Sequence, residues 1–134
     1  MMKHEEKDSD HLMKLTIEQV LQLGVTAHKK GKLQEAERFY QTILQSQPSH
    51  PDANHNLGVL AVSLNKTDAA LPLFKAALDA NPNIEQFRLS YIDALVKKNQ
   101  LENAEVAAKQ ALKFEQDFIK DKNILRGIML KLER

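Results

Sequence analysis

The chain repeats itself with a period of 34 residues. The clearest marker of this period is the pair Leu23-Gly24, which returns as Leu57-Gly58 and again as Tyr91-Ile92. Other columns in the same register hold an alanine, an aromatic residue in the first two units, a leucine and a closing proline: Ala36, Ala70 and Ala104; Tyr40, Phe74 and Ala108; Leu44, Leu78 and Leu112; Pro48, Pro82 and Gln116. A fixed period of roughly 20 to 50 residues indicates a repeat architecture, in which copies of one small motif stack on one another.

Each unit has the pattern of two amphipathic helices, because its apolar residues recur at spacings of three and four. Thr16 followed by Gln19 predicts a capping box at the start of the first helix. Gly31, Asn65 and Asn99 share the column where the first helix of each unit should end. These are the residue types that tolerate a left-handed helix cap, so the turn is specified in all three units.

At these residues the chain resembles the tetratricopeptide repeat (TPR) family. The resemblance implies an all-α fold, a right-handed superhelical solenoid of three helix-turn-helix TPR units followed by a C-terminal capping helix. The expected parts are a disordered tail at 1–10 and one TPR domain over 11–134, divided into repeats at 17–50, 51–84 and 85–118 and a capping helix at 119–134.

The third unit departs from the pattern of the other two. Ile92 replaces the glycine and Ala108 replaces the aromatic residue, which suggests that volume is exchanged across the helix pair. Because Gln116 stands in place of the closing proline, two structures are open for the end of the chain. In the first, which we favour, the segment after residue 118 folds back on the stack as a cap. In the second, residues 102–126 form one long helix that supports a homodimer.

Composition narrows the classes of function. The 19 Lys+Arg and 18 Asp+Glu give no basic face for nucleic acid, and we expect no nucleic-acid partner. The longest apolar stretch is much shorter than the roughly 20 residues of a membrane helix, and no secretory signal opens the chain. There are no cysteines, no histidine pair with ligand spacing and no glycine-rich phosphate loop. We therefore expect a cytoplasmic, non-enzymatic protein with no metal, no cofactor, no catalytic residues and no membrane partner.

The TPR resemblance places candidate binding residues on the first helix of each unit, which lines the concave groove in that family. The predicted peptide-binding groove comprises Leu21, Gln22, Val25, Asn56, Val59, Leu89, Ser90 and Asp93. In related superhelical repeats an asparagine in the column of Gln22, Asn56 and Ser90 binds the main chain of a peptide, and only Asn56 matches it. The apolar members of the set predict contact with a protein partner, with the segment around Leu12 and Leu15, or with a second copy of the chain.

The resulting hypothesis is a protein-protein interaction scaffold or adaptor that holds a peptide segment or partner helix in its groove. Two alternatives remain. The chain is similar to the N-terminal repeat regions of bacterial glycosyltransferases, sulfotransferases and methyltransferases at Leu15–Gln19, Ala36–Tyr40 and Pro82–Phe87. That similarity implies a substrate-presenting arm of a larger transferase. The other alternative is a homo-oligomerisation module.

Overall fold

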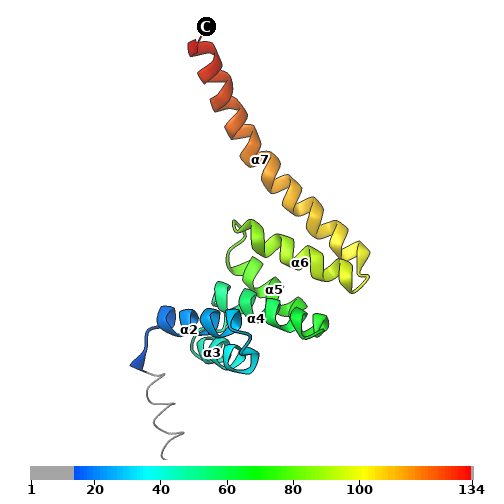
Figure 1. The fold of residues 1–134 in the computed structure, drawn as a ribbon. Helices are drawn as coiled ribbons and strands as arrows, with labels where there is room; N and C mark the ends of the chain where they lie inside the picture. Colours follow the sequence, from blue (N-terminus) through cyan, green and yellow to red (C-terminus); the bar gives the residue numbers. More distant parts are fainter. Residues whose placement is uncertain (1–13, 134) are drawn as a thin grey trace, which may run out of the picture.

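The structure is a stack of three helical hairpins (Figure 1). The computed structural model describes residues 14–133, with only part of the side chains described in 111–133, and the tail expected at 1–10 lies outside this range. The helices are α2 (Ile17–Lys29), α3 (Leu33–Ser46), α4 (Pro51–Ser63), α5 (Thr67–Ala80), α6 (Glu85–Lys97) and α7 (Leu101–Glu133). The first helices of the hairpins thus begin at residues 17, 51 and 85, one period apart.

The caps predicted from the sequence are formed. The Thr16 hydroxyl accepts a hydrogen bond from the Gln19 amide at 3.1 Å, and the Gln19 side chain accepts one from the Thr16 amide at 2.9 Å. Gly31, Asn65 and Asn99 all have positive φ, at 76°, 59° and 57°. The left-handed cap at these three positions ends the first helix of each hairpin and turns the chain back on itself.

The first two hairpins are held by an aromatic ring that lies on a glycine. A Cβ added to Gly24 would stand 2.5 Å from Cε1 of Tyr40, and one added to Gly58 would stand 2.5 Å from Cε1 of Phe74. Both rings are almost fully buried. Because any side chain at either glycine would collide with the ring, the two helices approach as closely as they do only with glycine there.

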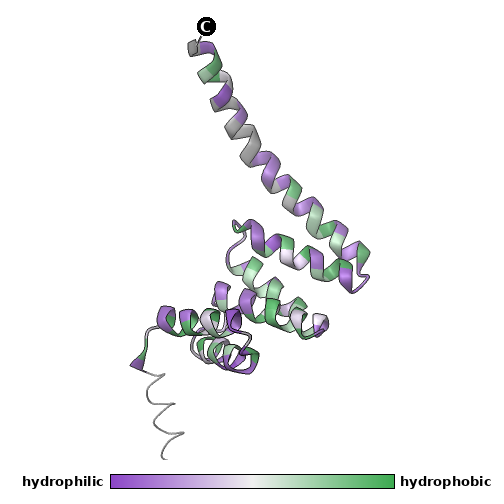
Figure 2. Ribbon diagram, in the orientation of Figure 1, coloured by the Kyte–Doolittle hydropathy of each residue, from purple (hydrophilic) through white to green (hydrophobic). Residues whose placement is uncertain are grey.

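Buried apolar residues fill the contacts between hairpins. Tyr40 packs in one cluster with Leu60 of α4, and Phe74 packs in another with Ala94 of α6. The same buried clusters therefore close each of the first two hairpins and connect it to the next unit. Figure 2 shows that α4 and α5, in the middle of the stack, are rich in apolar residues, whereas apolar and polar residues mix along α7.

The third hairpin packs differently, and the expected exchange of volume is not found. Ala108 is exposed, so it does not face Ile92 across a closed interface as such an exchange requires. α6 and α7 contact each other less extensively than the helices of the first two hairpins do. Without the glycine and the ring, nothing brings α7 as close to α6 as α5 is to α4.

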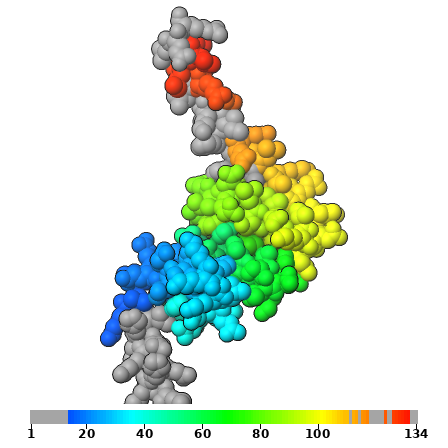
Figure 3. All heavy atoms as spheres, in the orientation of Figure 1, coloured from blue at the N-terminus to red at the C-terminus, as the bar shows by residue number. Residues whose placement is uncertain are grey.

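The separate capping helix expected at 119–134 is not formed, and this prediction was wrong. α7 continues without a break from Leu101 to Glu133 and projects beyond the stack (Figure 3). The physical reason lies in the local sequence: Gln116 stands where Pro48 and Pro82 close the other units, and neither proline nor glycine occurs between Leu101 and Arg126. Polar residues such as Asp117 do not by themselves end a helix whose backbone bonds can continue.

The glycine contact gives a direct test on stability. Gly58→Ala should lower the free energy of unfolding by about 1–3 kcal/mol, because the new methyl group overpacks the Phe74 ring. Gly127→Ala is the matched control, since a Cβ there meets no atom within 4 Å. It should be neutral or stabilising by up to about 1 kcal/mol, since alanine is the better helix former. Urea denaturation of both variants measures this, and equal effects at the two positions would contradict the packing argument.

Candidate functional site

A hollow of about 260 Å3 lies between the first two units, on the side of their first helices. It is lined by residues of α2, α3 and α4: Val25, His28, Lys29, Tyr40, Asn56 and Val59. The ring of Tyr40 that packs on Gly24 also lines this hollow, so the contact that sets the helix spacing also shapes the site. Three of the predicted groove residues, Val25, Asn56 and Val59, come together here.

The other predicted residues of the first unit do not share this hollow. Leu21 is half-buried and packs against the clusters that contain Ala27 and Val20. Gln22 lines a second hollow of about 340 Å3 with Leu15, Gln19, Leu23 and Thr26. The carboxamides of Gln22 and Asn56 thus lie in different depressions. The residues around Leu12, proposed above as a cover, lie outside the described part of the chain.

On α6, Ser90 is already engaged by neighbouring side chains. Its Oγ lies 2.8 Å from Nε2 of His55 in a hydrogen bond across to α4, and it accepts a second bond of 3.2 Å from Nε2 of Gln86. Ser90 therefore joins two units instead of continuing a row of free amide-like groups. The predicted polar column is reduced to Asn56 as the member that lines the hollow between α2 and α4.

The remaining predicted residues lie on the exposed surface of α6. Leu89 is 52% exposed and, seven residues further on, Val96 is 51% exposed. The carboxylate of Asp93 lies between them in sequence and pairs with Nζ of Lys97 at 3.6 Å. This part of the surface is apolar with one ion pair, and it adjoins α4 through the bond between His55 and Ser90.

His55 is a buried residue at the centre of the junction between the second and third units. Its ring centroid is 5.5 Å from that of Phe74 and 4.8 Å from that of Phe87. Burial lowers the pKa of His55 from its ordinary value of 6.5, while a hydrogen bond with the Asn56 side chain and the charge of Asp52 act in the opposite direction. The residue is therefore a neutral structural histidine above that value.

Two buried polar residues in one column were missed in the sequence. Nδ2 of Asn54 donates to the Pro48 carbonyl at 3.0 Å, and Nη1 of Arg88 donates to the Pro82 carbonyl at 2.9 Å. Asn54 and Arg88 are 34 residues apart, and each satisfies the carbonyl of the proline that closes the preceding unit. The signal in the sequence is a polar residue, Asn54 or Arg88, at the same column of two successive units.

Arg88 also borders a larger hollow of about 540 Å3 between α5, α6 and α7. Its Nη2 lies 3.6 Å from Oε1 of Glu115 on α7, and Tyr91, Leu78 and Val106 line the same space. This hollow lies where α7 packs loosely on α6. Four of its polar lining residues, Lys75, Asp79, Arg88 and Asn103, are hydrogen-bonded or ion-paired, and we attribute the hollow to the divergent packing of the third unit.

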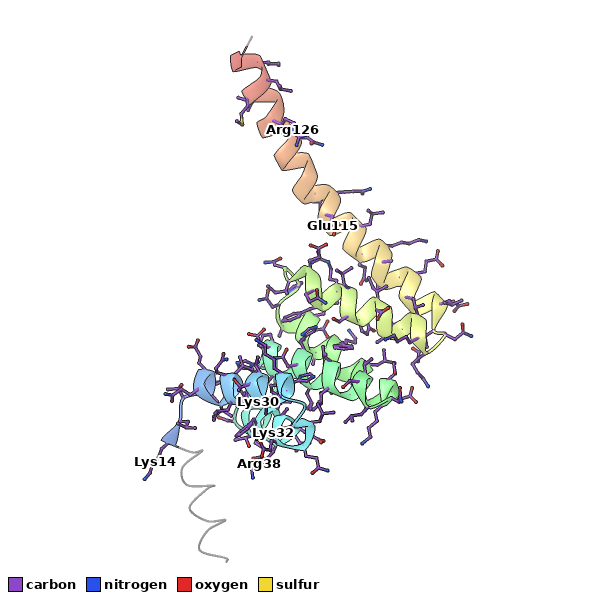
Figure 4. The ribbon with its side chains drawn as sticks, viewed as in Figure 1. Lys14, Lys30, Lys32, Arg38, Glu115 and Arg126 are labelled. Carbon is purple, nitrogen blue, oxygen red and sulfur yellow. The ribbon has the colours of Figure 1, made fainter. Side chains whose placement is uncertain are left out.

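The described residues bear on three other classes of site: metal, membrane and nucleic acid. In the part of the chain whose side chains are described, no group of three His, Cys, Asp or Glu residues is placed to hold a metal ion. No helix of that part is long and apolar enough to cross a bilayer. Lys30, Lys32 and Arg38 lie around the α2–α3 turn and on α3 (Figure 4), and all three are exposed. The absence of a nucleic-acid partner stays a prediction.

Comparison with known proteins identifies the protein family of this chain. Two family models, each described as a tetratricopeptide repeat, match residues 20–50 and 61–121, which together make up more than half of the chain. The chain belongs to the tetratricopeptide repeat family. No curated protein sequence matches it.

Solved structures support the same fold. One structure of MamA aligns with a TM-score of 0.72 and 22% identity over 78% of this chain and 61% of its own. A second MamA structure aligns at 0.64 and 26% identity over 73% of this chain and 56% of its own. A mutant O-GlcNAc transferase of Thermobaculum terrenum aligns at 0.65 and 25% identity over 72% of this chain but only 19% of its own. The chain thus spans a little over half of MamA and about a fifth of the transferase.

These matches confirm the predicted all-α superhelical solenoid and the likeness to the repeat region of a glycosyltransferase. Tetratricopeptide repeats with neighbours of this kind suggest a protein-interaction scaffold.

The buried histidine predicts a dependence of stability on pH. Because the pKa of His55 is lower in the folded than in the unfolded protein, the unfolded state binds the proton more readily below about pH 6.5. Stability should therefore be full above that pH and fall as the pH drops through the folded pKa. His55→Gln, which keeps an amide to meet Ser90 but cannot titrate, should lose less stability between pH 7.5 and 5.5. Urea midpoints that fall equally in both proteins would show that His55 is not responsible.

Proposed function

We propose that this chain binds an extended or helical segment of a partner protein through the hollow between α2 and α4. The observation that carries the proposal is the position of Asn56 beside Val25 and Val59, above the Tyr40 ring. A carboxamide that can both donate and accept lies there beside apolar side chains, in a hollow that His28 and Lys29 also line. This combination suits a peptide group flanked by an apolar side chain.

The size of the hollow favours a peptide over a small molecule. Its volume of about 260 Å3 lies below the usual range of roughly 300–1,000 Å3 for small-molecule pockets. A hollow of this size accommodates about one large side chain of a bound segment. The exposed Leu89 and Val96 on α6 would extend the apolar contact along the stack. Apolar burial would then supply affinity, and Asn56 would fix the orientation of the segment.

Binding of this kind would differ from that of a groove in which every repeat contributes an asparagine to the peptide main chain. Ser90 is engaged with His55 and Gln86, and Gln22 lies in a different hollow. With a single hydrogen-bonding group for the peptide main chain, the partner would be selected mainly by how well its side chain fits the hollow. Binding of any extended peptide regardless of its side chains is disfavoured. We therefore propose a partner defined by its apolar residues, presented next to one exposed peptide group.

A second candidate function rests on the likeness to the O-GlcNAc transferase. At 25% identity over 72% of this chain, the likeness is to a limited part of that enzyme. The same groove would then present a protein substrate to a catalytic domain carried by a longer form of this chain. The genomic sequence separates the two candidates. An open reading frame that continues past Arg134 into a transferase domain favours the substrate-presenting arm, and a stop codon there favours the adaptor.

The adaptor proposal is tested by peptide selection and one matched pair of substitutions. Dodecapeptides enriched from a random displayed library on the intact chain should bind Asn56→Ala about 2- to 10-fold more weakly, the loss of one hydrogen bond of about 0.5–1.5 kcal/mol. Asn123→Ala, an exposed asparagine on α7, is the control and should bind like the wild type. Fluorescence polarisation of the labelled peptides measures the change.

The melting temperature of Asn56→Ala should fall only slightly, because the side chain is half-buried on the groove side of α4 and the substitution removes a single hydrogen bond, the one to the adjacent His55. The proposal fails if no peptide is enriched. It also fails if Asn56→Ala and Asn123→Ala bind the enriched peptides equally well.

A further inference from the structure

The distal part of α7 extends beyond the rest of the chain. The ion pair between Arg88 and Glu115 ties α7 to α6, and Figure 4 shows Glu115 beside α6 and Arg126 well beyond it. Among the other described helices, α7 makes its main contacts with α6. Residues 116–133 therefore form a projecting helix about 27 Å long at a rise of roughly 1.5 Å per residue.

A helix of this length and composition is not expected to stand alone in water. Isolated helices below roughly 12–15 residues are marginal, and longer ones in proteins still owe most of their stability to packing of an apolar face. Ile128 and Met129, near the end of α7, are 50% and 55% exposed. Large apolar side chains at the tip of a projecting helix indicate a surface that another element covers.

The sequence places small and apolar residues along one line of α7 at alternating spacings of three and four. The line begins on the side of α6, where Ala104 is buried, and continues into the projecting part. Its members are Ala104, Ala107, Ala111, Phe114, Phe118, Asp121, Leu125, Ile128 and Leu132. These are the a and d positions of a heptad pattern with one polar member, and we call them the α7 stripe.

A repeat of 3.5 residues is the pattern with which one helix packs along another helix for several turns. The first part of the α7 stripe is used by α6 within the chain. The continuation from residue 118 has the same pattern, but α6 does not extend that far (Figure 1). The occupant that fits a heptad line on a helix is a second helix with the same period.

We propose that the distal part of α7 pairs in antiparallel orientation with α7 of a second copy of this chain. The charges at the g positions are compatible with this orientation, whereas at the e positions on the other side of the stripe Lys122 lies beside Lys122 of the second copy. Asp117 and Lys131 occupy g positions, and an antiparallel pair centred near residue 123 brings Asp117 of each copy beside Lys131 of the other. Two opposite-charge contacts then flank the apolar centre, and Ile124 lies beside Ile124 of the second copy.

The parallel arrangement is disfavoured by the polar member of the stripe. In a parallel, in-register pair, Asp121 would lie directly opposite Asp121 of the second copy, inside the seam. Two like charges at a d position repel each other where little water reaches them. In the antiparallel pair position 121 instead lies opposite Leu125, next to Lys122 of the second copy. This pairing is independent of the groove, which lies between the first two units.

The mass of the intact chain in solution tests the pairing. Sedimentation equilibrium at micromolar concentrations should give about twice the 15.2 kDa of one chain. Leu125→Asp places a charge in the seam and should return the mass to that of one chain. Asn123→Asp adds the same charge at the outer f position and should leave the mass doubled. A wild-type mass of one chain, or a doubled mass in Leu125→Asp, overturns the proposal.

The orientation is tested by cross-linking, because the chain contains no cysteine of its own. Ile124→Cys should form a disulfide-linked dimer on mild oxidation, since antiparallel pairing brings the two copies of position 124 together. Ile128→Cys should not, because its two copies are separated by about 15 Å along the axis, ten residues at roughly 1.5 Å each. Cross-linking of Ile128→Cys with none for Ile124→Cys would show a parallel pair and overturn the antiparallel assignment.

Discussion

The contact between an aromatic ring and a glycine sets the geometry of this solenoid. Tyr40 on Gly24 and Phe74 on Gly58 fix how closely the two helices of a unit approach, and each ring then enters a cluster with the following unit. The spacing inside one unit therefore determines where the next unit can pack. The third unit has Ile92 and the exposed Ala108 in these columns, so α7 is held less closely. The large hollow bordered by Arg88 lies where that constraint is missing.

A second constraint operates between units, through buried polar groups. The carbonyl of a proline that closes a unit is turned toward the next unit, and leaving it buried without a partner would be unfavourable. Asn54 and Arg88 satisfy the carbonyls of Pro48 and Pro82. In the third unit Gln116 replaces the proline, so the chain makes no turn there and α7 continues. The same substitution removes the turn and produces the projecting helix.

The sequence predicted the local features because each depends on the type of one residue. The cap at Thr16 and the left-handed turns at Asn65 and Asn99 follow from what those side chains can do. The end of α7 could not be predicted in this way. Polar residues such as Asp117 allow a turn without requiring one, and whether α7 breaks depends on tertiary contacts that the local pattern does not contain.

The candidate site, too, could be predicted from the sequence only in part. The repeat register placed Val25, Asn56 and Val59 on the first helices, and the structure brings them together. The register could not show that Ser90 is engaged by His55, because that bond joins residues 35 positions apart and depends on how α6 is rotated against α4. Residues in the same column of the repeat occupy equivalent positions on their helices. The hydrogen-bond partners of their side chains, however, depend on neighbouring residues that differ from one repeat to the next.

The two proposed binding surfaces, the hollow beside Asn56 and the α7 stripe, lie at different ends of the molecule and differ in how rigidly they are held. The hollow beside Asn56 lies between the two units that are held by ring-on-glycine contacts, so its walls are set before a ligand arrives and little ordering is required on binding. The α7 stripe lies beyond the divergent unit, where the helix extends away from the stack. In an antiparallel pair the two grooves would face separate regions of solvent at opposite ends. A partner with two copies of the recognised segment would then bind the second groove at a high effective concentration, so weak single sites would act together.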